Sequence, residues 1–171
     1  MTLANWITSS RFVLAPLVYW QLTVPTQTGL YWGIGLLILA GLTDLADGYA
    51  ARARDEISEL GKTLDPLADK LLILASLSAL AVRWDLPSWM VGVYLIKELI
   101  QVIAGAYALR RVKQVIPANR WGKSATFIFF LGFGLFLLNQ TAGTTVIGAA
   151  IMVSFYALYT YYLAFRRLTG K

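Results

Sequence analysis

Apolar residues occur in six long runs along the 171-residue chain, separated by short polar segments. A helix needs about 17 to 25 mostly apolar residues to cross a bilayer, where its backbone polar groups must be satisfied within the segment. The predicted spans, the first of them extended upstream by a polar turn, are Phe12–Val24, Leu30–Ala50, Pro66–Val82, Pro87–Leu109, Trp121–Leu138 and Thr144–Phe165. With 58% hydrophobic and 14% charged residues, the chain is predicted to be an all-α integral membrane protein with six transmembrane helices, and residues 1–171 a single membrane domain.

The chain contains no cysteine and no histidine. Disulfides, thiolate nucleophiles and thiolate metal sites are therefore excluded. A general base has to be a carboxylate, a lysine, a tyrosine or water. Any bound metal is expected to be a hard cation with oxygen ligands, such as magnesium, calcium or manganese.

Positive charge is concentrated on alternate connections between the spans. The segments Pro25–Gly29, Arg83–Asp85 and Asn139–Gly143 carry turn formers and little charge. Basic residues lie on the other side, at Arg52, Arg54, Lys62, Lys70, Arg110, Arg111, Lys113, Arg120, Lys123, Arg166, Arg167 and Lys171. The positive-inside rule then predicts a multi-pass protein of the cytoplasmic membrane with both termini in the cytoplasm. These charges also favour anionic lipid headgroups, and no nucleic-acid partner is expected.

Four aspartates, Asp44, Asp47, Asp65 and Asp69, fall within one short part of this apolar chain. A carboxylate at a membrane is costly unless it is paired, hydrated or bound to a cation. Each pair has a spacing of three or four residues and is predicted to share a helical face. Two antiparallel helices would then form a polar, metal-binding cavity open to the cytoplasm. The alternative is an ion-pair network that only holds helices together, but the motif offers a single arginine, Arg52.

Small and basic residues accompany the aspartates. Asp65 followed by Pro66 is typical of an N-cap with proline at the first helical position, so the third helix is predicted to begin there. Gly48 and Ala51 leave bare backbone that a bulky ligand could approach, and Arg52 could hold a phosphate. Oxygen ligands, a small-residue platform and cationic groups together suit a pyrophosphate-linked substrate and predict phosphoryl-group transfer.

The acidic stretch satisfies the pattern D-x2-D-G-x2-A-R-x8-G-x3-D-x3-D at every defined position, through Asp44, Asp47, Gly48, Ala51, Arg52, Gly61, Asp65 and Asp69. In this spacing the chain resembles the CDP-alcohol phosphatidyltransferases. The resemblance covers nearly the whole chain, because that family also has six transmembrane helices and an N-terminal stretch similar to Asn5, Thr8 and Arg11.

The resemblance implies that CDP-diacylglycerol gives its phosphatidyl group to an alcohol and releases CMP. It assigns Asp44, Asp47, Asp65 and Asp69 to the binding of Mg²⁺ or Mn²⁺, as two ions, and Asp69 also to the role of general base. It further implies a homodimer in the lipid bilayer.

The resemblance also places the nucleotide. Gly48, Ala51 and Arg52 would form the nucleotide platform, together with Asn5 and Thr8. From the residues alone, Asn5 and Thr8 lie near one helical face and could equally cap or anchor the first helix.

The acceptor is indicated by a later stretch, Lys97-Glu98, Arg110-Arg111 and Gly122–Thr126. It is similar to the acceptor side of phosphatidylglycerophosphate synthases, which implies glycerol 3-phosphate held by the four basic residues Lys97, Arg110, Arg111 and Lys123. Those enzymes have Arg-Glu where this chain has Lys-Glu. The acidic stretch also resembles the CMP-forming cardiolipin synthases, whose acceptor is phosphatidylglycerol. Lys123 could instead be a positive-inside anchor.

Two further expectations concern the interior of the spans. Adjacent helical residues do not face each other, so Glu98 is predicted to bond a neighbouring helix or a substrate water rather than Lys97. Gly132 and Gly134 are predicted to allow close helix packing. A small cation transporter is the rival interpretation, but a transport path would also place acids near the midplane, where Glu98 is the only candidate.

Overall fold

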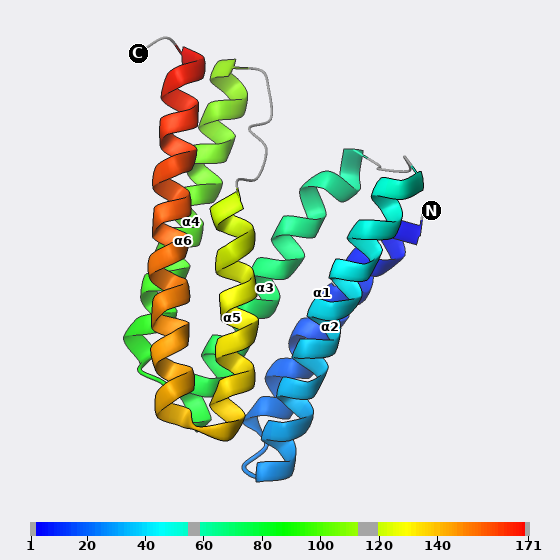
Figure 1. Cartoon of the computed structure of the whole chain (residues 1–171), viewed down its shortest axis with the longest axis vertical. Helices are drawn as coiled ribbons and strands as arrows, with labels where there is room; N and C mark the ends of the chain where they lie inside the picture. The colour runs from blue at the N-terminus through cyan, green and yellow to red at the C-terminus, as the bar shows by residue number, and fades with distance from the viewer. Residues whose placement is uncertain (1–2, 55–58, 113–119, 170–171) are drawn as a thin grey trace. The chain divides into compact units, whose positions relative to one another are not determined.

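The protein is described from a computed structural model that covers residues 3–54, 59–112 and 120–169, with side chains for 12–42, 68–108, 110–111 and 120–169. Within these ranges every regular element is a helix (Figure 1). The helices are α1 (Leu3–Thr23), α2 (Gln27–Arg54), α3 (Glu59–Arg83), α4 (Ser88–Val112), α5 (Arg120–Leu138) and α6 (Gln140–Thr169). The predicted all-α class and the order of the helices are confirmed.

The helices around the acidic stretch are longer than the apolar pattern predicts. The second continues past Ala50 to Arg54, and the third begins at Glu59. The predicted helix start at Asp65-Pro66 is therefore wrong. A proline inside a helix removes one backbone hydrogen bond and costs about 3 kcal/mol, so it disfavours the helix before it without forbidding it. Hydropathy detects only the apolar part of a helix, so it did not predict the polar first turn of α3, which begins at Glu59.

Among the residues whose side chains are described, three helices are long and apolar enough to cross a membrane, namely α4 over Ser88–Ala108, α5 and α6. Shorter apolar stretches of the described residues lie in α1 and α2, at Phe12–Thr23 and Gln27–Leu42. Large apolar side chains are also exposed on the outer faces of the helices, among them Trp20, Trp32 and Leu138. Exposed apolar surface on this scale is costly in water and suits lipid. The chain is a membrane protein.

The chain forms two compact units, residues 1–88 and 89–171. In the first unit α1 packs against both α2 and α3. Buried side chains of α1, such as Val18 and Leu22, form its core with Ile34 of α2 and Leu77 of α3. At one end, the Trp84 indole Nε1–H donates to the Leu22 carbonyl at 2.8 Å. The carboxyl ends of α1 and α3 therefore lie together, and these two helices run in the same direction.

The opposite end of this unit carries the sequence motif. Because α2 runs antiparallel to α1 and α3, its carboxyl end lies beside the amino ends of both (Figure 1). Helix α3 is followed by Asp85, an exposed residue in the left-handed region with φ 56°. Aspartate is one of the few side chains that adopt this conformation readily.

In the second unit α5 and α6 form a tight antiparallel hairpin. Asn139 closes the turn, because its side-chain oxygen accepts a hydrogen bond from the Ala142 N–H at 3.0 Å. Gly132 is buried against Ile147 of α6, and a Cβ at this glycine would lie 2.8 Å from the Ile147 side chain. The predicted role of Gly132 in close packing is confirmed.

Gly143 is the position where the hairpin tolerates a side chain least. A Cβ there would lie 2.5 Å from the Cα of Phe136, and backbone cannot move aside as a flexible side chain can. We expect Gly143→Ala to lower the free energy of unfolding by about 1–3 kcal/mol, measured by SDS titration of the purified protein. Gly92→Ala is the matched control, because nothing lies within 4 Å of the added Cβ. An equal effect of both substitutions would contradict this packing.

Large side chains join α4 to the hairpin. The rings of Tyr94 and Phe129 meet edge to face at 5.2 Å, which joins α4 to α5. Tyr107 and Phe165 meet in the same way at 5.9 Å and join α4 to α6. Nearer the start of both helices, a Cβ at Gly148 would lie 3.5 Å from the Met90 methyl group. The two contacts between α4 and α6 occur in the same order along both helices, so α4 runs parallel to α6. It therefore runs antiparallel to α5, the other helix of the hairpin.

Candidate active site

The four aspartates of the motif lie on two continuous helices. Asp44 and Asp47 belong to the last turns of α2, and Asp65 and Asp69 to the first turns of α3. Both pairs therefore have the helical spacing that places residues on one face, as predicted. The two helix ends that carry them lie at the same end of the first unit (Figure 1).

Asp69 is the one motif aspartate whose side chain is described. It is half-buried and follows the fully buried Ala68, which faces the core of the first unit. The side chains of Asp44, Asp47 and Asp65 lie outside the described set. Among the side chains that are described, no group of three or more acidic residues could hold a metal ion. The predicted ligand set is not tested by this observation, although its donors are all carboxylates, which suit a hard cation.

The predicted nucleotide residues are carried by the same end of the unit. Gly48, Ala51 and Arg52 follow Asp47 on the last turns of α2, and Asn5 and Thr8 lie in the first two turns of α1. Their side chains lie outside the described set. The ribbon nevertheless brings these two segments and the start of α3 to one end, as a shared binding site requires (Figure 1).

The predicted acceptor residues fall at two levels of the second unit. Tyr94 of α4 contacts Phe129 of α5, and the two helices are antiparallel. Lys123 lies six residues before Phe129, so it is level with Ile100, which lies six residues after Tyr94. Ile100 lies within one helical turn of Lys97. Arg110 lies thirteen residues beyond Lys97, about 20 Å along the helix at 1.5 Å per residue. A single phosphate therefore cannot contact both Lys97 and the Arg110-Arg111 pair.

Lys97 and Glu98 form a buried ion pair. The Lys97 Nζ lies 2.8 Å from Glu98 Oε1, with 5% and 9% of the two residues exposed. The ammonium also lies 5.9 Å from the centre of the Tyr94 ring. The prediction that adjacency prevents this contact is wrong. Neighbouring residues point about 100° apart on a helix, but a four-carbon stem is long and flexible enough to close that angle.

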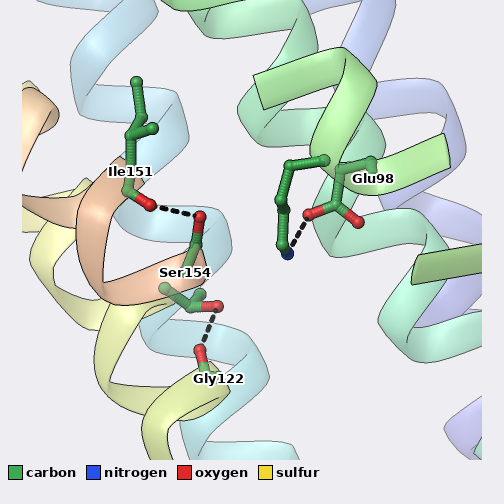
Figure 2. A network of polar contacts seen from close by, with 6 residues as sticks. Glu98, Gly122, Ile151 and Ser154 are labelled. Carbon is green, nitrogen blue, oxygen red and sulfur yellow. Dashed lines mark hydrogen bonds and ion pairs between the residues drawn. The ribbon is translucent and has the colours of Figure 1, made fainter. Parts of the chain in front are cut away.

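Two buried or half-buried hydroxyl groups lie at the same level as this ion pair. Ser154 of α6 donates to the Ile151 carbonyl at 2.7 Å, and Thr126 of α5 donates to the Gly122 carbonyl at 3.2 Å. Figure 2 shows Glu98 on α4, Ser154 on α6 and Gly122 on α5 around one region of the second unit. Sequence reasoning missed Ser154, whose only signal is a hydroxyl in an apolar span.

The buried pair predicts a stability change that does not depend on catalysis. Lys97→Met leaves a buried carboxylate without its ammonium, so we expect a loss of about 3–5 kcal/mol in the free energy of unfolding. The double substitution Lys97→Met/Glu98→Leu removes both charges and is expected to be near neutral or stabilising. SDS titration of the purified variants measures both. Additive losses in the double variant would show that the two side chains do not interact.

Comparison with known proteins identifies the family to which this chain belongs. Residues 1–159 match the model of the family described as CDP-alcohol phosphatidyltransferase. The chain belongs to this family, and it is a membrane-bound transferase of phospholipid biosynthesis. Membership favours the transferase over the small cation transporter considered from the sequence.

Two curated relatives differ in the acceptor that their names specify. Over 154 residues the chain is 34% identical to a protein of Streptomyces coelicolor named cardiolipin synthase (CMP-forming), covering 88% of this chain and 72% of the relative. Over 151 residues it is 35% identical to CDP-diacylglycerol–glycerol-3-phosphate 3-phosphatidyltransferase of Bacillus subtilis, covering 81% and 77%. Both relatives belong to the class that the sequence resemblance indicates.

Proposed function

We propose that this protein transfers the phosphatidyl group of CDP-diacylglycerol to glycerol 3-phosphate, giving phosphatidylglycerophosphate and CMP. The observation that carries the proposal is the complete eight-residue motif on α2 and α3, in a chain that belongs to the CDP-alcohol phosphatidyltransferase family. The Bacillus subtilis relative supports this acceptor by its name.

The proposal includes the arrangement in the membrane. All six helices cross the bilayer, the two compact units form one membrane domain, and the active site opens to the cytoplasm, where the basic connections lie. The protein acts as a homodimer in the cytoplasmic membrane. Cysteine accessibility from the two sides of sealed vesicles tests the topology, and the absence of native cysteine makes single-cysteine variants directly interpretable.

The carboxylates of Asp44, Asp47, Asp65 and Asp69 hold two divalent cations, Mg²⁺ or Mn²⁺. Bound there, the cations would neutralise the pyrophosphate of the donor and the charge that develops on the departing CMP. Gly48 and Ala51 let the nucleotide lie close to the backbone of α2. Arg52 contacts a phosphate, and Asn5 and Thr8 of α1 complete the nucleotide site.

Asp69 is the general base of the proposed reaction. Its carboxylate accepts the proton of the acceptor hydroxyl as the hydroxyl oxygen attacks the phosphorus that bears the diacylglycerol. A new phosphorus–oxygen bond forms, the bond between this phosphorus and the oxygen of CMP breaks, and the CMP oxygen keeps the bonding electrons. No covalent enzyme intermediate is needed, which is consistent with a chain that lacks cysteine and histidine.

Lys123 and Lys97 hold the acceptor in this proposal. Lys123 is exposed in the first turn of α5 and can offer its full charge to a phosphate. The Lys97 ammonium is compensated by Glu98, so it serves as a hydrogen-bond donor at a neutral site rather than as a lone charge. The distance of about 20 Å along α4 leaves Arg110 and Arg111 out of contact with the same phosphate.

Phosphatidylglycerol is the second candidate acceptor. The Streptomyces coelicolor relative bears the name cardiolipin synthase (CMP-forming) and aligns with most of this chain. A lipid acceptor would approach laterally, from within the bilayer. Purified protein supplied with CDP-diacylglycerol and either acceptor decides between them. CMP release with phosphatidylglycerol alone would overturn the assignment to glycerol 3-phosphate.

Lys123 provides a sharper test of the acceptor site. Charge-assisted contacts to phosphate contribute about 1.5–3 kcal/mol, so Lys123→Gln is expected to raise KM for glycerol 3-phosphate about 10- to 100-fold while KM for CDP-diacylglycerol stays within about twofold. Initial rates of CMP release at varied acceptor concentration measure both. Lys70→Gln is not a suitable control because Lys70 adjoins Asp69, whereas Arg83→Gln changes an exposed charge elsewhere. A KM for acceptor that Lys123→Gln leaves unchanged would remove this residue from the site.

A further inference from the structure

The Lys97 ammonium is held by two other residues of its own helix. Glu98 Oε1 lies 2.8 Å from the Lys97 Nζ, and the same Nζ lies over the ring of Tyr94, 5.9 Å from the ring centre. Tyr94 and Lys97 are three residues apart on α4, a spacing that places them on one helical face. Their contact is within the range of a cation–π interaction. The ion pair fixes one distance, and the ring adds a second constraint on the direction of the ammonium.

The Tyr94 ring is itself fixed by aromatic side chains of α5. Tyr94 is buried, and its ring meets Phe129 edge to face at 5.2 Å. Phe129 stacks in turn on Phe133, with ring centres 6.2 Å apart, and both phenylalanines are fully buried. A close-packed interior leaves such rings little room to rotate away. Phe133, Phe129 and Tyr94 therefore form a packed series of rings that ends at the Lys97 ammonium.

The same aromatic contact relates the two lysines of the proposed acceptor site, which belong to different helices. Lys97 follows Tyr94 by three residues on α4, and Lys123 precedes Phe129 by six residues on α5. The packing of Tyr94 against Phe129 thus sets the level of one lysine relative to the other. A lysine stem is long and flexible, so ordering it at the moment of binding weakens affinity, whereas an ammonium that is already held in place avoids that loss.

We propose that Tyr94 is a positioning residue of the acceptor site, because its ring, fixed by Phe129, holds the Lys97 ammonium in the orientation in which it donates to the acceptor. The inference rests on the proposed function, in which Lys97 contacts glycerol 3-phosphate. Tyr94 acts through Lys97 and does not itself contact the substrate. The ring rather than the phenol hydroxyl carries the effect, since a cation–π contact needs only the face of the ring.

Substitutions of Tyr94 separate the ring from the hydroxyl. Tyr94→Leu removes the ring and is expected to raise KM for glycerol 3-phosphate about 3- to 30-fold, while kcat and KM for CDP-diacylglycerol stay within about twofold. Tyr94→Phe keeps the ring and is expected to keep the wild-type KM for the acceptor within about twofold. Phe136→Leu is the matched control, because it removes another fully buried ring of the second unit, and its acceptor KM is expected to equal that of the wild type. Initial rates of CMP release from the purified full-length protein measure these constants.

A comparison in a second background shows whether Tyr94 acts through the ion pair. Lys97→Met/Glu98→Leu lacks both charges, so adding Tyr94→Leu to it is expected to leave the acceptor KM of that background unchanged. The inference alone would be overturned by an equal rise of KM in both backgrounds, by an unchanged KM in Tyr94→Leu, or by an equal rise in Phe136→Leu. Absence of CMP release from the wild type with glycerol 3-phosphate would instead overturn the proposed function, and the inference with it.

Discussion

Changing Asp69 to asparagine is expected to lower the rate of CMP release from CDP-diacylglycerol by about 10²- to 10⁴-fold, the usual contribution of a general base. Asparagine keeps the size of the side chain but cannot accept the proton of the acceptor hydroxyl. The half-buried position of Asp69 on α3, beside buried Ala68, leaves its side chain partly accessible to a substrate. Single-turnover rates at saturating glycerol 3-phosphate measure the chemical step.

Asp85→Asn is the matched control for this experiment. It makes the same chemical change at an exposed aspartate between α3 and α4, and asparagine tolerates the left-handed φ of 56° as well as aspartate does. We expect its rate to equal that of the wild type. Full activity in Asp69→Asn would show that another group, or water alone, takes the proton.

Removing divalent cations is expected to abolish CMP release. A chelator such as EDTA leaves the motif carboxylates in place but takes away the charge that neutralises the pyrophosphate, and that charge stabilises a transition state by several kcal/mol, about 10³-fold or more. Adding Mg²⁺ or Mn²⁺ in excess should restore the rate. Undiminished turnover after dialysis against EDTA would rule out a required metal ion.

The fold was largely predictable because lipid imposes a simple rule. A span must be helical and apolar, so six apolar runs predict six helices in the right order. The last turn of α2 and the first turn of α3 were not predictable in this way. The polar segments from Ala51 to Arg54 and from Glu59 onwards lie outside the apolar pattern. Proline at position 66 then suggested a helix start that the structure does not have.

The motif was readable from sequence because its spacing is both helical and specific. Asp44 with Asp47, and Asp65 with Asp69, keep their predicted helical relation. The acceptor side was harder, because its residues come from separate helices and their relative levels depend on packing. The Tyr94–Phe129 contact places Lys97 and Lys123 at one level, whereas the separation of Lys97 from Arg110 follows from their spacing along α4.

The Lys97–Glu98 pair shows a different limit of sequence reasoning. Helical geometry describes where side chains leave the backbone, and adjacent residues leave it on different sides. A buried ammonium and a buried carboxylate nevertheless gain more from meeting than their side chains lose by bending towards each other. The prediction for Glu98 considered only the directions in which the two side chains leave the helix. It omitted the free-energy cost of leaving a buried charge without a partner.

Direct titration of the metal site tests the central claim, that the four aspartates of α2 and α3 bind divalent cations. Electron paramagnetic resonance of Mn²⁺ follows the loss of the free-ion signal as purified protein is added in the presence of CDP, and it requires no turnover. The account predicts two ions bound per chain in the wild type, and weak or no binding when Asp44 and Asp65 are both changed to asparagine. Equal Mn²⁺ uptake by the wild type and this double variant would contradict it.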